Sequence, residues 1–253
     1  MSRRGRLVVF AVAAAGLAGL LAWGLGGLPP LGQTPPYGQM LITVATMTRQ
    51  VQNAVSGVNF DIRLADTILE EFLLLTAATG VTVLLRRLDD ERERSPEQLA
   101  AERPAPPPVS DAVRVWSLGL IGPTVVVGLS LIAHGHLSPG GGFQGGALMV
   151  TAGLLGFLAG RPRALPWGGG VELTEAMEGA AGAGIVILGL AGVAVGGAFG
   201  QNVLPVGQRG ALASGGLVPL VGGAVGVAVA SGTALVVRAF VAEALAIRRA
   251  RQR

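Results

Sequence analysis

Residues 115–160 read "VWSLGLIGPTVVVGLSLIAHGHLSPGGGFQGGALMVTAGLLGFLAG". Two apolar runs, Val115–Ala133 and Phe143–Gly160, flank a short stretch that is rich in glycine and holds both histidines of the chain. A helix needs about 20 apolar residues to cross a bilayer core of about 30 Å. The stretch therefore predicts two membrane-spanning helices joined by a tight turn.

The same kind of run recurs along the chain of 253 residues, of which only 13% are charged. The other four candidate spans are Leu7–Leu28, Thr67–Leu85, Gly179–Gly200 and Leu212–Val237. With 41 glycines and 15 prolines, many inside these runs, the composition is typical of a membrane protein. We therefore expect an all-α, polytopic integral membrane protein with about six transmembrane helices.

The basic residues predict the orientation. All 19 are arginines, and if the spans alternate in direction, 16 fall on the side of both termini and of the loop after residue 85, and 3 on the other. The positive-inside rule then predicts that both termini are cytoplasmic, in a multi-pass protein of the cell (cytoplasmic or inner) membrane. Because the charges lie at the ends of apolar segments and not on one face, they do not indicate a nucleic-acid partner.

The remaining segments suggest how the chain is divided. The first span resembles a signal peptide, but its long apolar run favours a retained anchor. Apolar residues at spacings of three and four over 39–58 predict an amphipathic surface helix, against lipid or a partner helix. A charged, proline-rich cytoplasmic linker over 89–111 separates a two-helix part, 1–88, from a four-helix part, 112–253.

A group of charged residues lies at the start of the second span. In a helix, Arg63, Asp66 and Glu70 would share one face. An ionisable group inside a membrane is by default a functional hypothesis, here a proton or ion relay. The alternative is a helix cap, in which Thr67 and Glu70 form a capping box. Glu71 would lie on another face, nearer the interface, where a structural role is expected.

A second acidic group, Glu172, Glu175 and Glu178, precedes the fifth span. Carboxylates in a first helical turn favour the positive end of the helix dipole, and this explains them without a function. Alternatively, Glu175 and Glu178 form a paired site that faces a neighbouring protein.

The glycine-rich turn contains G-x-G-x-x-G at residues 140–145, but it follows no strand, and no acidic residue occurs until Glu172. A dinucleotide site needs both, so we expect no cofactor. Without cysteine and with no acid nearby, two histidines are also a poor metal site, and no catalytic residues are indicated. Histidine side chains ordinarily change charge near neutral pH, so for His136 and His134 proton transfer and simple hydrogen bonding both stay open.

The turn carries a family resemblance. "HGHLSPGGGFQGG" (134–146) resembles the signature of the B subunit of multisubunit Mrp/Mnh-type cation/proton antiporters, and the resemblance extends over residues ~110–245. In that family the motif joins the first two of four membrane helices and includes His136. The other matching residues are Pro139, Gly140, Gly141, Gly142, Phe143, Gly145 and Gly146.

The first part, residues ~1–88, is similar to the C-terminal end of the large A subunit of the same complexes, which also occurs as a small separate subunit in related membrane-bound hydrogenases. The matching residues are Asn53, Asp61, Arg63, Asp66, Thr67 and Glu70, whereas Ile62 and Leu69 replace an aromatic residue and a glycine. The resemblance favours a place for Glu70 in an ion or proton path.

Together the resemblances imply an accessory, non-enzymatic subunit of a monovalent cation (Na⁺ or K⁺)/proton antiporter that contributes to assembly and to the ion path. Its partners would be large complex-I-like subunits, small membrane subunits and membrane lipid. The alternative is a membrane-arm subunit of an energy-converting hydrogenase or related respiratory complex.

Overall fold

The computed structural model describes residues 3–28, 30, 32, 35–85, 109–160 and 170–252, the last nine by their backbone alone. The described residues are helical and contain no strand. The chain divides into two units, Met1–Met40 and Leu41–Arg253. The first unit contains α1 (Arg3–Gly26), an apolar helix of 24 residues that is long enough to cross a membrane.

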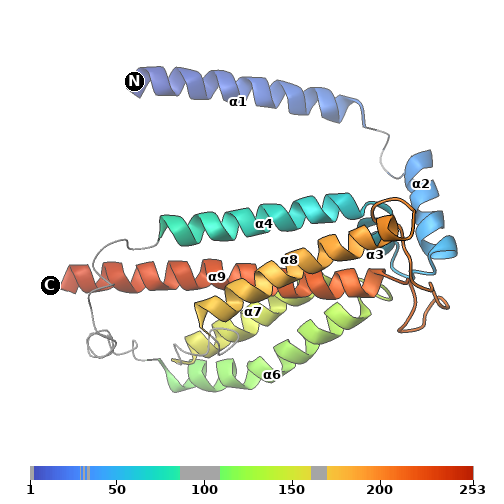
Figure 1. Ribbon diagram of the computed structural model, residues 1–253. Helices are drawn as coiled ribbons and strands as arrows, with labels where there is room; N and C mark the ends of the chain where they lie inside the picture. Colours follow the sequence, from blue (N-terminus) through green and yellow to red (C-terminus); the bar gives the residue numbers. More distant parts are fainter. Residues whose placement is uncertain are drawn as a thin grey trace. The chain divides into compact units, whose positions relative to one another are not determined.

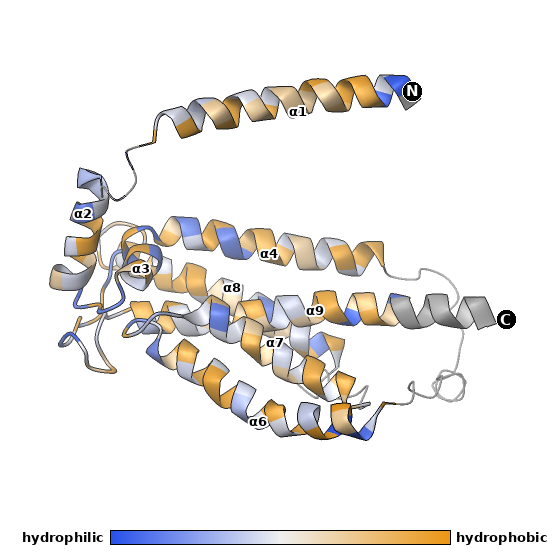
Figure 2. Ribbon diagram, turned by 180° about the vertical axis from the view of Figure 1, so that it is seen from behind, coloured by the Kyte–Doolittle hydropathy of each residue, from blue (hydrophilic) through white to orange (hydrophobic). Residues whose placement is uncertain are grey.

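The second unit is a bundle of antiparallel helices (Figures 1 and 2). Its long helices are α4 (Leu64–Leu84), α6 (Asp111–His134), α7 (Gly142–Leu158), α8 (Val171–Ala194) and α9 (Val218–Gln252). Five described helices, α1 included, are long and apolar enough to span a membrane, and α7 is a shorter apolar helix of 17 residues. The prediction of an all-α, polytopic membrane protein is therefore confirmed.

The centre of the bundle is α9. On one side, Val221, Val225 and Val229 of α9 form a core with Leu64 of α4 and Ile185 of α8. On the other side, a second core joins α9 to α7 through Ala230, Ala234, Met149 and Val150. The membrane-spanning part of α9 is 61% buried, against 11–28% for α4, α6 and α8. The apolar outer surfaces of those three helices are therefore left for lipid or for other proteins.

The two ends of the bundle differ. The loop end consists of residues 44–63, the turn 135–141 and the irregular segment 195–217; Figure 1 shows them around α3 (Ala54–Gly57). At the opposite end, the linker end, α4 finishes and α6 and α8 begin. The positive-inside rule predicts that the linker end is cytoplasmic.

Several predicted boundaries are wrong. The helix expected over 39–58 is interrupted: α2 (Pro36–Thr43) and the π-helical turn η1 (Val44–Thr48) end before Gln50, which has a φ of 56°. A second helical piece, α3 followed by η2 (Val58–Ile62), comes after it. Residues 89–108 of the predicted linker lie outside the described residues. The linker was expected to end at residue 111, and α6 begins there. The Ser110 side chain accepts a hydrogen bond from Val113 N–H at 3.4 Å.

The fifth and sixth spans also differ from the prediction. Helix α8 begins at Val171, eight residues before the expected start, and ends at Ala194. Glycines at positive φ (Gly196, Gly200, Gly207, Gly210, Gly215 and Gly216) then fold residues 195–217 into turns, which an apolar count cannot distinguish from helix. The early start of α8 places Glu178 in its third turn, within the bundle.

Candidate intramembrane carboxylate site

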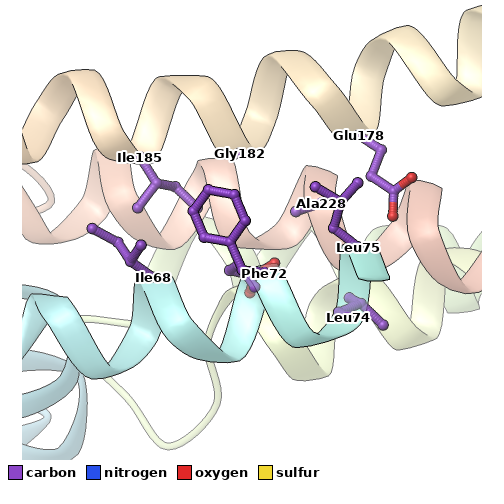
Figure 3. Close-up of a pocket in the computed structure, with 9 residues that line it drawn as sticks. Ile68, Phe72, Leu74, Leu75, Glu178, Gly182, Ile185 and Ala228 are labelled. Atoms are coloured by element: carbon purple, nitrogen blue, oxygen red, sulfur yellow. The ribbon is translucent and has the colours of Figure 1, made fainter. Parts of the chain in front are cut away.

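Between α4, α8 and α9 lies a small cavity of ≈20 Å³. By the same measure one water molecule needs about 10–15 Å³, so the cavity has room for about one water. Its walls are apolar except for two carboxyl groups, and Figure 3 shows Glu178 at one end of it. The lining residues are Ile68, Glu71, Phe72, Leu74, Leu75, Glu178, Gly182, Ile185 and Ala228.

The first carboxyl group belongs to Glu71 of α4, which is 7% exposed. Its Oε2 atom is buried and has no hydrogen-bond partner. Ion pairs of the first part of the chain lie elsewhere, since Arg63 pairs with Asp66 and Arg49 with Asp61. Glu71 is therefore a buried acid with no described cation beside it.

The second carboxyl group belongs to Glu178 of α8, which is 6% exposed and whose Oε1 atom is also buried without a partner. The glycine opposite makes room for it: a methyl group placed on Gly232 of α9 would lie 2.5 Å from Glu178 Oε1. Any larger residue at position 232 would therefore displace this carboxyl group.

The two acids lie at different depths. Glu71 is seven residues from the start of α4, which is about 10 Å along the axis. Glu178 lies level with Leu74, because both side chains are next to Gly232. Leu74 follows Glu71 by three residues, a rise of about 4.5 Å along α4, so the backbone of Glu71 lies nearer the loop end than the carboxyl group of Glu178 does. Both are thus well inside the apolar region, one nearer the loop end and one nearer the linker end.

The residues predicted as an ion path are only partly brought together. Arg63 and Asp66 form an ion pair on a half-exposed surface at the start of α4. Glu70 points to the exposed side of α4, among outward-facing Leu69 and Leu73. The capping alternative is wrong, because α4 begins at Leu64 and Thr67 donates instead to the carbonyl of Asn59 at 2.8 Å.

The sequence predicts a structural role for Glu71 because the expected span starts at Thr67, three residues after the observed start of α4 at Leu64. Successive helical residues are 100° apart, so Glu70 and Glu71 cannot share a face. The spacing of Glu175 and Glu178 at i and i+3 already indicates a paired site, but the sequence does not identify the residue of α4 that lines the same cavity.

Glycines in the first turns of α7 pack this helix closely against α6 and α9. A methyl group on Gly146 would lie 2.6 Å from the carbonyl oxygen of Gly226 on α9, and one on Gly142 would clash with the carbonyl oxygen of Gly222. On the other face, a methyl group on Gly145 would clash with Ile132 of α6. The start of α7 is thus in close contact with α6 and α9, as expected for small residues in membrane bundles. Phe143 points outward and is 54% exposed.

His136 lies in this turn and is 2% exposed. Its Nε2 atom is 3.0 Å from the carbonyl oxygen of Leu212, and its buried Nδ1 has no partner. Burial lowers the pKa of the imidazole, against the opposing effect of backbone contacts at Leu212 and Ala211. His136 therefore connects the turn to the segment 195–217, because Leu212 lies 76 residues further along the chain. His134 is exposed and contacts its own helix at Ser130.

Asn53 joins the first part of the chain to the same turn. Its side-chain amide donates to the carbonyls of Gly135 and Ser138 at 2.8 and 3.0 Å, and its backbone N–H donates to that of His136 at 3.0 Å. These bonds satisfy carbonyls that a helix–turn–helix would otherwise leave open.

A second connection at the loop end is built around Asp61, which is 6% exposed. Its Oδ2 atom is 3.1 Å from Arg49 Nε and accepts a hydrogen bond from Asn202 Nδ2, also at 3.1 Å. Burial raises the pKa of Asp61, and the Asn202 hydrogen bond and the Arg49 charge oppose that effect. We call these three residues the loop-end clamp.

Among the described residues, no group of three or more His, Asp or Glu side chains is placed to hold a metal ion. The chemistry that the cavity offers is therefore that of its two carboxyl groups, which bind or release protons or bind a cation.

Comparison with known proteins agrees with this fold. Residues 112–235 match the family described as a domain related to the MnhB subunit of Na⁺/H⁺ antiporter. An uncharacterised protein of Methanocaldococcus jannaschii is 31% identical over 116 residues, and that alignment spans 43% of this chain and 43% of the relative.

Two solved membrane complexes contain chains of similar structure. A chain of the membrane-bound sulfane sulfur reductase, an archaeal respiratory membrane complex, is 30% identical with a TM-score of 0.70, over 93% of this chain and 97% of the other. A chain of the Mrp complex from Dietzia sp. DQ12-45-1b has a TM-score of 0.67 at 24% identity, over 94% of this chain and 26% of the other, and this likeness concerns the fold.

Proposed function

The chain belongs, through residues 112–235, to the family of domains related to the MnhB subunit of Na⁺/H⁺ antiporters, and from this premise we propose that it is an accessory subunit of a monovalent cation/proton antiporter. As a membrane subunit of a Mrp-type antiporter-like complex, it would have two tasks: to hold neighbouring subunits together and to contribute carboxyl groups to the ion path. It would carry out no enzymatic reaction of its own.

The observation that carries this proposal is the pair of buried acids. Burying an unpaired carboxylate costs several kcal/mol, and membrane proteins retain ionisable groups in their spans mainly where ions or protons move. Glu71 comes from the first part of the chain and Glu178 from the MnhB-related part, so the site needs both parts. A simple scaffold would have no need of acids at this depth.

The exposed apolar surfaces support the assembly task. Helices α4 and α6 expose large apolar side chains, such as Leu73 at 70% and Val126 at 67%. Glu70 lies within the exposed face of α4, where it would be costly in lipid. We propose that a neighbouring subunit covers this face, and that Glu70, Asp66 and Arg63 contact that subunit at the border of its ion path.

A second candidate function is favoured by the respiratory complex, whose similar chain is matched over 97% of its length at 30% identity. There the same subunit type would couple ion movement to a redox reaction carried out by other subunits. The two functions place the same demands on this chain and differ only in its partners.

The test is purification of the tagged chain from its own membrane under mild conditions, followed by identification of the attached subunits and by transport assays in proteoliposomes. We expect several larger membrane subunits and proton release driven by Na⁺ or K⁺. Subunits with iron–sulfur or nickel sites would establish the respiratory alternative. Purification of the chain alone, with cation transport by itself, would refute both proposals.

Within the purified complex, Glu178→Gln is expected to reduce exchange while leaving the subunit composition unchanged. Glutamine has nearly the same size but can neither release a proton nor balance a cation. Glu172→Gln is the matched control, because Glu172 lies on the same helix and is exposed. Equal exchange in both variants would exclude Glu178 from the path.

A further inference from the structure

We propose that Glu71, one water molecule and Glu178 form a two-step relay that carries protons, and not the metal cation, through the middle of this subunit. The inference rests on the proposed function and identifies the transported species at the carboxylate site.

The lining of the cavity decides between a proton and a metal cation. A hard cation that leaves water needs about six oxygen ligands to replace its hydration shell. Apart from the two carboxyl groups, the lining side chains are aliphatic or aromatic, or absent at Gly182. The cavity has no hydroxyl or amide side chain and room for about one water, which is too few ligands for Na⁺ or K⁺. A proton needs only one acceptor at a time.

The geometry suits transfer in two steps. Both carboxyl groups line the same cavity, which has room for about one water, and each has a buried oxygen that lacks a hydrogen-bond partner. One water between them can accept from one acid and donate to the other, which satisfies both free oxygens. In the transfer, protonated Glu178 gives its proton to the water, the water gives one of its protons to ionised Glu71, and Glu178 is left as a carboxylate.

The charged groups around the cavity leave the two acids without a close cation. On α4, Glu70 is adjacent but exposed, and Asp66 is paired with Arg63. On α9, Arg238 and Glu243 lie beyond Gly232, with Arg238 six residues, or about 9 Å, further toward the linker end.

The remaining neighbours lie on α8. Glu175 is one turn from Glu178, on the linker-end side, and is exposed together with Glu172. Glu175 can therefore return a proton to Glu178 from that end.

The test measures the protonated carboxyl groups themselves, by infrared difference spectroscopy of the purified complex in water and in deuterium oxide at neutral pH. We expect a protonated carboxyl band that shifts in deuterium oxide, that changes in Glu71→Gln and in Glu178→Gln, and that persists in Glu172→Gln. Addition of NaCl or KCl should leave the band unchanged. A band that is absent, or that either salt removes, would overturn the relay.

This measurement does not depend on transport. If the band behaves as expected but the complex exchanges no cation for protons, the proposed function fails and the proton site stands. If the complex exchanges ions and the band is absent, the relay fails alone. In an active complex, each glutamine variant should slow exchange by about a hundredfold, since a positioned proton-transfer group contributes about 10²–10⁴ in rate. A reduction equal to that of Glu172→Gln would count against the relay.

Discussion

The contact between α7 and α9 allows a quantitative test of the bundle. In Gly146→Ala, the new methyl carbon would lie 2.6 Å from the Gly226 carbonyl oxygen, 3.0 Å from Val229 Cβ and 3.1 Å from Ala230 N. Ordinary contacts are about 3.5 Å or longer, so the two helices must separate by about 0.9 Å. Two of the three atoms belong to the α9 backbone, and no rotation of a side chain relieves the clash.

The expected cost is about 1–3 kcal/mol of the free energy of unfolding, the range found when an extra methyl group is forced into a well-packed core. The assay is denaturant titration of the purified protein in detergent, followed by far-ultraviolet circular dichroism. Gly223→Ala is the control, because a methyl group on Gly223 of the same α9 helix would have no neighbour within 4 Å. If the two variants unfold at the same denaturant concentration, the close contact between α7 and α9 at Gly146 is wrong.

Three further predictions concern the loop end. Asn202→Ala removes hydrogen bonds to Asp61, Gly215, Leu204 and Leu217. The change should lower the free energy of unfolding by about 2 kcal/mol or more and expose residues 195–217 to protease. Asn59→Ala, at an exposed position, should have neither effect. Burial raises the pKa of Asp61 above 3.8, so the folded state binds this proton more tightly than the unfolded state does. The free energy of unfolding should therefore fall as the pH rises above 3.8 through the folded pKa. Asp61→Asn should flatten that part of the profile of stability against pH, and an unchanged profile would contradict the burial argument. The pKa of His136 is lowered from 6.5 in the folded state, so the contribution of this residue to stability is present above pH 6.5 and is lost as the pH falls through the folded pKa. The difference between the free energies of unfolding at pH 8 and at pH 5 should therefore be smaller in His136→Asn.

The sequence predicts membrane crossing well because that property depends on length and apolarity, which are local. The glycine turn was also predicted, because small residues between two apolar runs admit few other structures. In contrast, the end of α8 and the start of α9 depend on glycine conformations within an apolar segment, and composition does not reveal them. Residues 39–58 have helical spacing, but Gln50 at positive φ breaks the helix where Asn53 binds the turn 135–141.

The candidate site shows a different limit. Arg63 and Asp66 form the ion pair that their spacing of three residues suggests, although Arg63 precedes α4, which begins at Leu64. Glu71 and Glu178 are 107 positions apart and lie in different parts of the chain, so only the packing of α4 and α8 on α9 shows that they line one cavity. A role of Glu70 in the ion path stays a prediction, and its test needs the complex with the neighbouring subunit.

The central position of α9 has a consequence for biosynthesis. A ribosome completes this helix after α4, α6, α7 and α8, yet it supplies the surface on which α4, α7 and α8 pack and the glycine that accommodates Glu178. The earlier helices therefore enter the bilayer before α9 is present. In this intermediate the carboxyl groups of Glu71 and Glu178 are already in the membrane without the helix that covers them. Chains that are truncated before Val218 should for this reason be targets for membrane quality control even though the preceding spans have been inserted.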